Sequence, residues 1–410
     1  MKVGSITLWG LAWRNLWRNR RRTWLTAGGI GFAVWLLVFA MSMQDGSFEV
    51  MVDNAARLLT GHVQLQHPDY QDDPSVEHWL AADPALRAQA VAASGVVAAL
   101  PRAAAFGLVS VGERSLGVQV MGVSPQDEAE ASTLPAATVA GRYLDGAPAQ
   151  AYLGAMLARN LGAAVGDEVV ILGAALEGGV AASAATVVGL FETGQPALDR
   201  ALLQIPIDDF RAAWNLPPDA VHSLVLILDR AGRAAPVAAA LGGPGRAALD
   251  WQALLPEARQ TVELKRVGAQ LFFVMVALIV TFSVVNTFMM TVFERTPELG
   301  MLMALGMRRG AVATELCIEA WWLGLLGVML GLAAGAATVA VLSQVGIPLP
   351  ADAAEVLVRY NLPDRMYPSF SIPAAIVAVV VMLVGVQVAV AVPAWRIRRL
   401  RPVQALRALA

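Results

Sequence analysis

Four long stretches that are almost free of charged residues constrain this chain more than any other feature. Residues 24–43, 271–293 and 372–394 contain no charge, and residues 316–342 contain only Glu319. Each stretch has roughly the 20 residues that an α-helix needs to cross the hydrocarbon core of a bilayer. Charged residues make up 15% of the chain, whereas a soluble domain has about 25%. The stretches therefore predict four transmembrane helices.

Two alternatives exist for these stretches. They would be buried core helices if the protein were soluble, but core helices seldom stay uncharged over such a length. The first stretch contains Ala40-Met41-Ser42, which faintly resembles a signal-peptide cleavage site, although a signal peptide has an apolar core of only about 7–15 residues. The single cysteine, Cys317, cannot form a disulfide within one chain and does not indicate the redox compartment.

Basic residues are concentrated in three of the segments that flank the stretches. These residues are Lys2, Arg14, Arg18, Arg20, Arg21 and Arg22 before the first stretch, Arg295, Arg308 and Arg309 between the second and third, and Arg396, Arg398, Arg399, Arg401 and Arg407 after the fourth. Because such residues favour the cytoplasmic side of a membrane, we expect both termini in the cytoplasm. The loop 343–371 contains three acids, Asp352, Glu355 and Asp364, and two arginines, Arg359 and Arg365. On this topology it lies on the extracytoplasmic side.

The predicted fold is four transmembrane α-helices plus a large mixed α/β extracytoplasmic domain between the first and second spans. The predicted order is a cytoplasmic amphipathic segment at 1–23, the first span at 24–43, the outer domain with its stalk helices at 44–265, the second span at 268–293, a cytoplasmic segment at 294–313, the third span at 314–342, an outer loop at 343–371, the fourth span at 372–395 and a cytoplasmic tail at 396–410.

The outer segment 44–265 is long enough to have its own core. Alternating polar and apolar residues predict strands at 62–66, 116–123, 168–172 and 223–228, and short helices are expected at 82–94 and 207–214. The Ala- and Gly-rich stretch 173–185 indicates a hairpin or a flexible loop between strands. Residues 254–267 should form a helical stalk that leads into the second span.

Motifs for catalysis are absent from the sequence. Neither of the two lysines follows a glycine-rich loop, so there is no phosphate-binding P-loop for ATP. His62 and His67 with Glu77-His78 are conceivable zinc ligands, but their spacing matches no known zinc pattern. We expect ordinary surface or strand histidines there, and a chain that is not an enzyme and holds no metal or cofactor. We also expect no nucleic acid as a partner.

Two features of the third span have both a functional and a structural interpretation. Glu315 and Glu319 are acids in or near a membrane span, where burial of a carboxylate is costly and often functional. They would alternatively favour the N-terminal end of the helix dipole and reach the interface. Gly327, Gly331 and Gly335 recur every four residues, which allows close approach of another helix, in a dimer or within the bundle.

The short charged segment 294–310 lies between the second and third spans on the cytoplasmic side. Pro297 suits the first turn of a helix, Glu298 favours that end of the dipole, and Gly306 is suited to end it. Leu299, Leu302, Met303 and Leu305 would give the helix an apolar side. Such a helix lies along the membrane, where it either meets a cytoplasmic partner or is an ordinary interfacial turn.

These segments resemble FtsX/MacB-type ABC transporter permeases over essentially the whole chain. The matching segments are Trp13–Thr26, Leu153–Gly162 with Val165–Val169, Asn286 with Phe293–Met307, Glu319 with Gly324, Gly327 and Gly331, and Pro393–Arg407. The resemblance implies a non-catalytic permease that pairs with a second permease chain and with a separate ABC ATPase dimer, which binds ATP and Mg²⁺. It also implies a bacterial inner-membrane location, with the large domain in the periplasm.

In that family, movement of the ATPases is relayed through the cytoplasmic coupling helix to the outer domain. The resemblance therefore gives an ATPase-coupling role to Glu294, Arg295, Glu298, Leu299, Leu302, Leu305 and Met307. It places lipid substrates between the first and second spans, where Phe39, Met43, Phe272 and Met275 are the candidate residues.

The chain length, the four spans and the segments Leu59–Leu65 and Thr186–Gly194 look most like the lipoprotein-releasing permeases of Gram-negative bacteria. Those extract lipoproteins from the inner membrane for a periplasmic carrier. The hairpin that hooks the carrier corresponds here to Gly173–Ala185, which is short and has no obvious anchoring residue. MacB-like efflux of peptides, antibiotics or other amphiphiles with an adaptor, and an FtsX-like signal relay, are the alternative functions.

Overall fold

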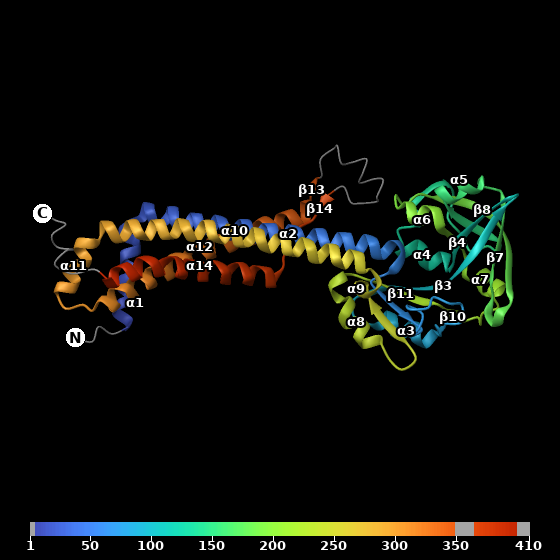
Figure 1. The fold of residues 1–410 in the computed structure, drawn as a ribbon, viewed down its shortest axis with the longest axis horizontal. Helices are drawn as coiled ribbons and strands as arrows, with labels where there is room; N and C mark the ends of the chain where they lie inside the picture. The colour runs from blue at the N-terminus through green and yellow to red at the C-terminus, as the bar shows by residue number, and fades with distance from the viewer. Residues whose placement is uncertain (1–4, 349–364, 400–410) are drawn as a thin grey trace. The chain divides into compact units, whose positions relative to one another are not determined.

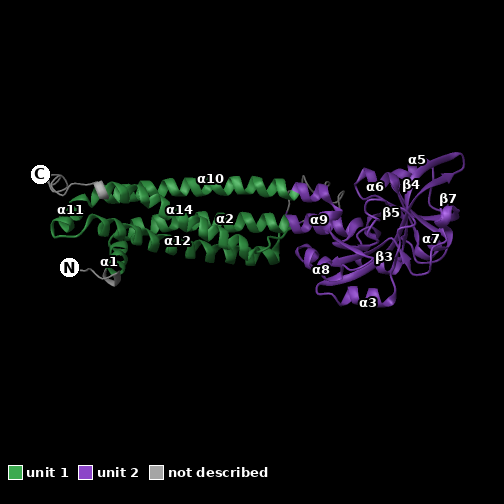
Figure 2. Ribbon diagram, turned by 60° about the horizontal axis from the view of Figure 1, so that its bottom comes forward, with its two compact units in different colours: residues 1–47, 262–347, 366–410 green, residues 48–261, 348–365 purple. Residues whose placement is uncertain are grey.

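The computed structural model describes residues 5–348 and 365–399. It divides into two compact units (Figure 2). Within the described residues, unit 1 comprises the chain up to residue 47, residues 262–347 and the chain from residue 366. Unit 2 comprises residues 48–261 together with Pro348 and Arg365. Several residues named in the sequence analysis lie outside the described residues. They are Lys2, the loop residues Asp352, Glu355, Arg359 and Asp364, and the part of the closing motif beyond Arg399.

Unit 1 is a bundle of long helices (Figure 1). Its helices are α1 (Ser5–Arg18), α2 (Arg20–Ala55), α10 (Pro256–Glu294), α11 (Thr296–Ala304), α12 (Arg309–Val345) and α14 (Ile372–Arg399). In the described chain, α2, α10, α12 and α14 are long and apolar enough to cross a membrane, as predicted. Helix α10 is continuous from Pro256 and therefore includes the predicted stalk.

Glycines on α12 hold it close to α2. A Cβ added at Gly327 would lie 2.7 Å from the Cβ of Ile30, one at Gly331 would collide with the carbonyl oxygen of Gly31, and one at Gly335 would lie 3.0 Å from Val38. Of the two interpretations of this glycine face, packing within the bundle is therefore correct. The face is occupied by α2 of the same chain and does not form a dimer seam.

Helix α1 folds back against α12 through tryptophan rings. Trp9 and Trp13 both meet Trp322 of α12 edge to face, with ring centroids 5.7 and 5.0 Å apart, and Trp13 also meets Trp17 at 5.7 Å. Such edge-to-face pairs add to the hydrophobic gain of burying the rings. The amphipathic segment predicted at 1–23 is thus a packed helix of the bundle over its described part.

Unit 2 is built around a ten-stranded mixed sheet, which confirms the predicted α/β class. The strand order is β12-β1-β11-β3-β4-β9-β6-β8-β5, and β7 pairs with β3 and β8. The strands are β1 (Val63–Gln66), β3 (Val96–Val111), β4 (Arg114–Val123), β5 (Thr138–Gly141), β6 (Gln150–Gly154), β7 (Glu168–Ala174), β8 (Val180–Phe191), β9 (Leu202–Pro206), β11 (Ser223–Leu228) and β12 (Ala247–Asp250).

Smaller elements complete unit 2. A separate two-stranded sheet joins β2 (Leu80–Ala81) to β10 (Ala220–Val221). The helices are α3 (Pro84–Ala92), α4 (Pro125–Ala131), α5 (Ala155–Leu161), α6 (Pro196–Ala201), α7 (Ile207–Trp214), α8 (Ala234–Leu241) and α9 (Trp251–Leu254). Helix α7 covers the sheet with Phe210 and Trp214, which are fully buried and stack with their ring centroids 4.2 Å apart.

The sequence predicted either a hairpin or a flexible loop at 173–185, and the structure forms the hairpin. Strands β7 and β8 pair antiparallel from Glu168↔Thr186 to Ala174↔Val180. The turn between them contains Glu177 and Gly178 at positive φ values of 60° and 76°, a conformation that glycine adopts without strain. Val180 beside the turn is 80% exposed. The hairpin therefore presents a short tip with one large exposed apolar side chain.

A buried ion pair within unit 2 joins β3 to α4, and its arginine also binds the turn that follows α2. Helix α2 is followed by a π-helical turn, η1 (Ala56–Thr60). Arg102 of β3 donates to the carbonyl oxygen of Leu59 in this turn and forms two hydrogen bonds, of 2.5 and 2.8 Å, with the Glu128 carboxylate of α4. Both side chains are almost completely buried. The guanidinium thus connects η1, the sheet and α4.

Candidate functional site

The short helix α11, which lies between α10 and α12 in the chain, has well-defined ends. Helix α10 stops at Glu294, Arg295 leaves helical geometry with φ −97° and ψ 4°, and Pro297 lies in the first turn of α11. At the other end, Gly306 has φ 97° and donates its N–H to Met303, while Met307 donates to Leu302. This pair of hydrogen bonds is a Schellman motif, which requires a residue such as glycine at positive φ. The predicted stop at Gly306 is confirmed.

Two opposite faces of α11 have different surroundings. Leu299 and Met303 are buried, and both belong to the apolar core of the bundle. Met301 is 56% exposed and Leu305 is 80% exposed. Since residues four apart lie on one side of a helix, the Leu299 side attaches α11 to the bundle and the Met301 side is free for contact. We call Met301 and Leu305 the exposed apolar pair.

The residues predicted for ATPase coupling differ in their exposure to solvent. Leu305 lies on the exposed side, whereas Leu302 and Met307 are half-buried. Leu299 faces inward, so it supports the helix and is not a free contact. Met301 was not among the predicted residues, although its spacing of four from Leu305 would have identified it.

Ion pairs connect α11 and the end of α10 to the N-terminal helices α1 and α2. Arg18 of α1 donates two hydrogen bonds of 2.8 Å to the Glu298 carboxylate, and Arg22 of α2 lies 3.0 Å from Glu294. The hydrogen bonds from Arg18 hold the pKa of Glu298 below its ordinary value, and Glu298 in turn raises the pKa of Arg18. The predicted acids Glu294 and Glu298 are therefore engaged with arginines of the same chain.

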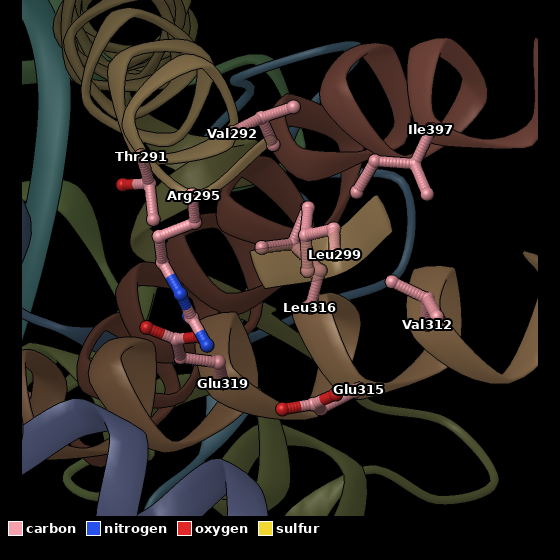
Figure 3. A pocket seen from close by; sticks show the side chains of 9 residues that line it. All are labelled: Thr291, Val292, Arg295, Leu299, Val312, Glu315, Leu316, Glu319 and Ile397. Carbon is pink, nitrogen blue, oxygen red and sulfur yellow. The ribbon is translucent and has the colours of Figure 1, made fainter. Parts of the chain in front are cut away.

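A second layer of polar contacts lies deeper in the bundle, and Figure 3 shows three of its side chains, Arg295, Glu315 and Glu319. The Arg295 guanidinium lies 3.4 Å from Glu298 and 3.2 Å from Glu319 of α12, and Glu319 is only 7% exposed. Asn15 of α1 donates a hydrogen bond of 2.6 Å to Glu315. A buried carboxylate requires such partners because loss of hydration is otherwise uncompensated.

These contacts decide between the two interpretations of the α12 acids. Helix α12 begins at Arg309, so Glu315 and Glu319 lie well beyond its first turn. Both residues are buried. The interpretation in which they serve the helix N-terminus and reach the membrane interface is therefore wrong. They are buried polar contacts between α12 and the segments around α11.

A small cleft separates α10, α11, α12 and α14 at this level (Figure 3). Its lining combines the Arg295, Glu315 and Glu319 side chains with apolar ones. The apolar and hydroxyl residues are Thr291, Val292, Leu299, Val312, Leu316 and Ile397. Among the described residues that line it, none is a cysteine, serine or histidine. The cleft is a polar joint between helices.

The four residues predicted to contact lipid lie on two helices of unit 1. Phe39 of α2 is half-buried and stacks on Trp35 with a centroid separation of 5.9 Å, and Met43 is half-buried as well. Phe272 and Met275 of α10 are 43% and 60% exposed. Helices α2 and α10 approach one another at Gln44, which donates to the Lys265 carbonyl oxygen.

Sequence reasoning missed Asn15, Arg18 and Arg22 as members of the site. Arg18 and Arg22 were interpreted as part of the basic N-terminal segment, and all three residues only as part of the family-like segment Trp13–Thr26. Their partners Glu315, Glu298 and Glu294 are 272 to 300 residues further along the chain. No local pattern indicates which acid a basic residue of α1 or α2 will meet, because this depends on how α1 folds back onto α12.

Four membrane-length helices, a large domain after the first of them and a short ion-paired helix between the second and third define a membrane permease. A comparison with protein families agrees. Residues 23–243, more than half of the chain, match the MacB-like periplasmic core domain, and residues 271–402 match the FtsX-like permease C-terminal family. The chain belongs to the FtsX/MacB-type ABC transporter permeases, which are non-catalytic membrane subunits.

Proteins of lipoprotein-releasing systems are similar to this chain over most of their length. The chain is 24% identical to the lipoprotein-releasing system transmembrane protein LolC of Neisseria meningitidis serogroup B, covering 76% of each chain. It is also 24% identical to the LolC protein of Xylella fastidiosa strain 9a5c, covering 72% of this chain and 74% of that protein. The resemblance to the lipoprotein-releasing permeases is thus confirmed.

Solved structures of outer domains are more distant. The periplasmic region of MacB from Actinobacillus actinomycetemcomitans is 14% identical, with a TM-score of 0.34, and the match covers 49% of this chain and 92% of that one. The extracellular domain of the ABC-type transporter YknZ is 11% identical, also with a TM-score of 0.34, over 46% of this chain and 99% of that one.

Proposed function

We propose that this permease subunit transmits ATP-driven movement of a separate ATPase dimer to its large domain and thereby releases lipoproteins from the bacterial inner membrane. The named relatives support the substrate class, since both are lipoprotein-releasing proteins similar over about three quarters of the chain. On this proposal both termini and α11 lie in the cytoplasm, unit 2 lies in the periplasm, and a second permease chain completes the transporter.

The observation that carries the coupling role is the structure of α11. Its exposed apolar pair would be costly to leave in water and is available to a partner. Its opposite face is buried in the bundle core, and Glu298 in its first turn, with Glu294 and Arg295 just before it, forms ion pairs with α1, α2 and α12. A partner that pushes on Leu305 therefore acts on the whole cytoplasmic end of the bundle.

The membrane-facing helices support a role without an aqueous channel. Helix α10 exposes Leu271, Phe272, Met275 and Ile279 among other apolar side chains. Such a surface suits lipid tails, the acyl chains of a lipoprotein or a second permease chain. Phe272 and Met275 keep their proposed place at the substrate, together with Phe39 and Met43 of α2.

Leu305→Glu tests the coupling role. Because Leu305 is 80% exposed, the charge should not disturb the fold, but it should prevent an apolar contact with the ATPase. We expect loss of ATPase co-purification, or ATP turnover without release of lipoproteins from inner-membrane vesicles. Val180→Glu is the matched control, because Val180 is equally exposed but belongs to unit 2. It should leave ATPase binding unchanged.

The two parts of the proposal fail in different ways. Wild-type ATPase binding together with wild-type ATP turnover and lipoprotein release in Leu305→Glu would refute the coupling role of α11. Unaltered lipoprotein sorting after depletion of the wild-type protein from cells would refute the substrate assignment. In that case efflux of other amphiphiles or signal relay would be the remaining functions of this permease.

A further inference from the structure

Two histidines of unit 2 are brought together by the loop between β1 and β2. His67 follows the last residue of β1, and His78 lies just before β2. Ligand atoms of His67, Asp69 and His78 all lie within 4.8 Å of one another, and the two imidazole rings stack with centroids 5.0 Å apart. The spacing of these residues matches no standard zinc motif, so only the fold reveals the cluster.

From this geometry we infer that His67, Asp69 and His78 form a binding site for a divalent transition-metal ion, with Zn²⁺ as the best-suited ion. Two imidazoles and a carboxylate are ligands that Zn²⁺ accepts, and water completes a tetrahedral site with three protein ligands. The inference is independent of the function proposed above.

The hydrogen bonds of His78 prepare it to bind a metal. Its Nδ1 lies 2.8 Å from the carbonyl oxygen of Asp73 and 3.8 Å from the Asp73 carboxylate. An N–H at Nδ1 that donates to this carbonyl leaves the lone pair of Nε2 free for an ion. Metal-binding histidines almost always have such a hydrogen bond from their other nitrogen, since it fixes the tautomer and the ring orientation.

The backbone of the loop is held in place by successive turns. Tyr70 donates its N–H to His67, Asp73 donates to Asp69, and His78 donates to Ser75. The loop is also attached to the sheet, because the Tyr70 ring stacks on the buried His222 ring at 5.3 Å. The backbone therefore positions the three ligands before any ion binds, which reduces the entropy cost of binding.

Only side-chain rotation is needed to complete the site. In a tetrahedral Zn²⁺ site with bonds of about 2.0–2.1 Å, ligand atoms are roughly 3.3 Å apart, so they must approach by about 1–1.5 Å. The imidazole planes are nearly parallel, at 9°, so one ring must turn before both nitrogens point at one ion. His67, Asp69 and His78 have 33%, 71% and 24% of their side chains exposed, which leaves room for this rotation.

The local charge favours a cation. Between His67 and His78 the loop also contains Asp69, Asp72, Asp73 and Glu77, and no lysine or arginine. The acids attract a divalent ion whether or not they bind it directly. For this reason the experiment must separate specific ligation from simple attraction by the charge of the loop.

Titration of Zn²⁺ into the full-length protein in detergent, purified without a histidine tag, tests the inference. We expect one saturable Zn²⁺ site per chain in the calorimeter. His67→Ala and His78→Ala should each weaken binding by at least about 100-fold, since removing even an outer-shell partner costs about 10–100-fold. Asp72→Asn is the matched control, because it removes one charge from the same loop without removing a ligand of the cluster.

Asp69→Asn provides a variant whose folding is not in question, because the Asp69 side chain is 71% exposed. It should also weaken binding, and by more than Asp72→Asn. The inference is overturned if the wild-type protein shows no saturable site. It is equally overturned if the His67, His78 and Asp69 variants bind Zn²⁺ as well as Asp72→Asn does.

Discussion

Removing one partner of the buried ion pair between Arg102 and Glu128 should destabilise unit 2 strongly. Their side chains are 3% and 1% exposed, and the carboxylate accepts two hydrogen bonds from the guanidinium. In Glu128→Gln the amide can replace only part of this interaction, and the Arg102 charge remains buried. Breaking such a pair costs about 3–5 kcal/mol.

That cost is large relative to the total stability of a domain, which is about 5–15 kcal/mol. The neighbouring residue on α4 supplies a matched control. Asp127 pairs with Arg87 at 3.0 Å, but these side chains are 37% and 40% exposed. An exposed pair contributes only about 0–1 kcal/mol. Asp127→Asn should therefore have little effect, although it changes the same charge one residue away.

Hydrogen exchange of the full-length protein in lipid nanodiscs is a suitable assay, because it reports the opening free energy of β3 and β4 separately from the membrane helices. The double variant Arg102→Met with Glu128→Leu should recover much of the loss, since no buried charge remains. Recovery will be incomplete because the Leu59 carbonyl oxygen loses its donor. If Glu128→Gln and Asp127→Asn shift exchange equally, burial of the pair is not the cause of its strength.

Two further predictions concern helix packing and pH. Gly331→Ala should lower the thermal stability of the bundle, at a cost of about 1–3 kcal/mol, because its Cβ collides with the backbone of α2. Gly29→Ala, whose Cβ meets nothing within 4 Å, should not lower it in the same melting experiment, because alanine is the better helix former. Burial lowers the pKa of His222 to about 4. An unfolded chain binds a proton there below about pH 6.5, so exchange protection of unit 2 should fall as the pH drops from 6.5 to 4, and His222→Gln should reduce that slope.

Local patterns predicted the elements of this fold well, as α7 and β11 illustrate. Helix α7 has the predicted bounds Ile207–Trp214, and β11 the predicted bounds Ser223–Leu228. Amphipathic spacing and the strand pattern at 223–228 are properties of the segment itself, so they can be interpreted without knowledge of its neighbours. The span of α10 was predictable for the same reason.

The contacts between distant segments were not predictable in this way. The pairing of Arg18 with Glu298 joins residues 280 apart, and the meeting of His67 with His78 depends on the path of the loop between two strands. The glycine spacing on α12 indicated close packing, but only the structure shows that α2 is its partner. The sequence therefore shows that a helix face is suited to close packing, but it does not show which other helix packs against that face.

The position of Arg295 determines how α11 responds to force. Its backbone separates α10 from α11, and its guanidinium contacts Glu298 on α11 and Glu319 on α12 at the same time. A displacement of α11 that broke these contacts would leave the Glu319 carboxylate buried without its nearest cation, which costs several kcal/mol. A displacement that carries the ends of α10 and α12 along keeps the ion pairs and costs less. The transmission that we propose for this permease therefore follows from the contacts of one arginine at the break between two helices.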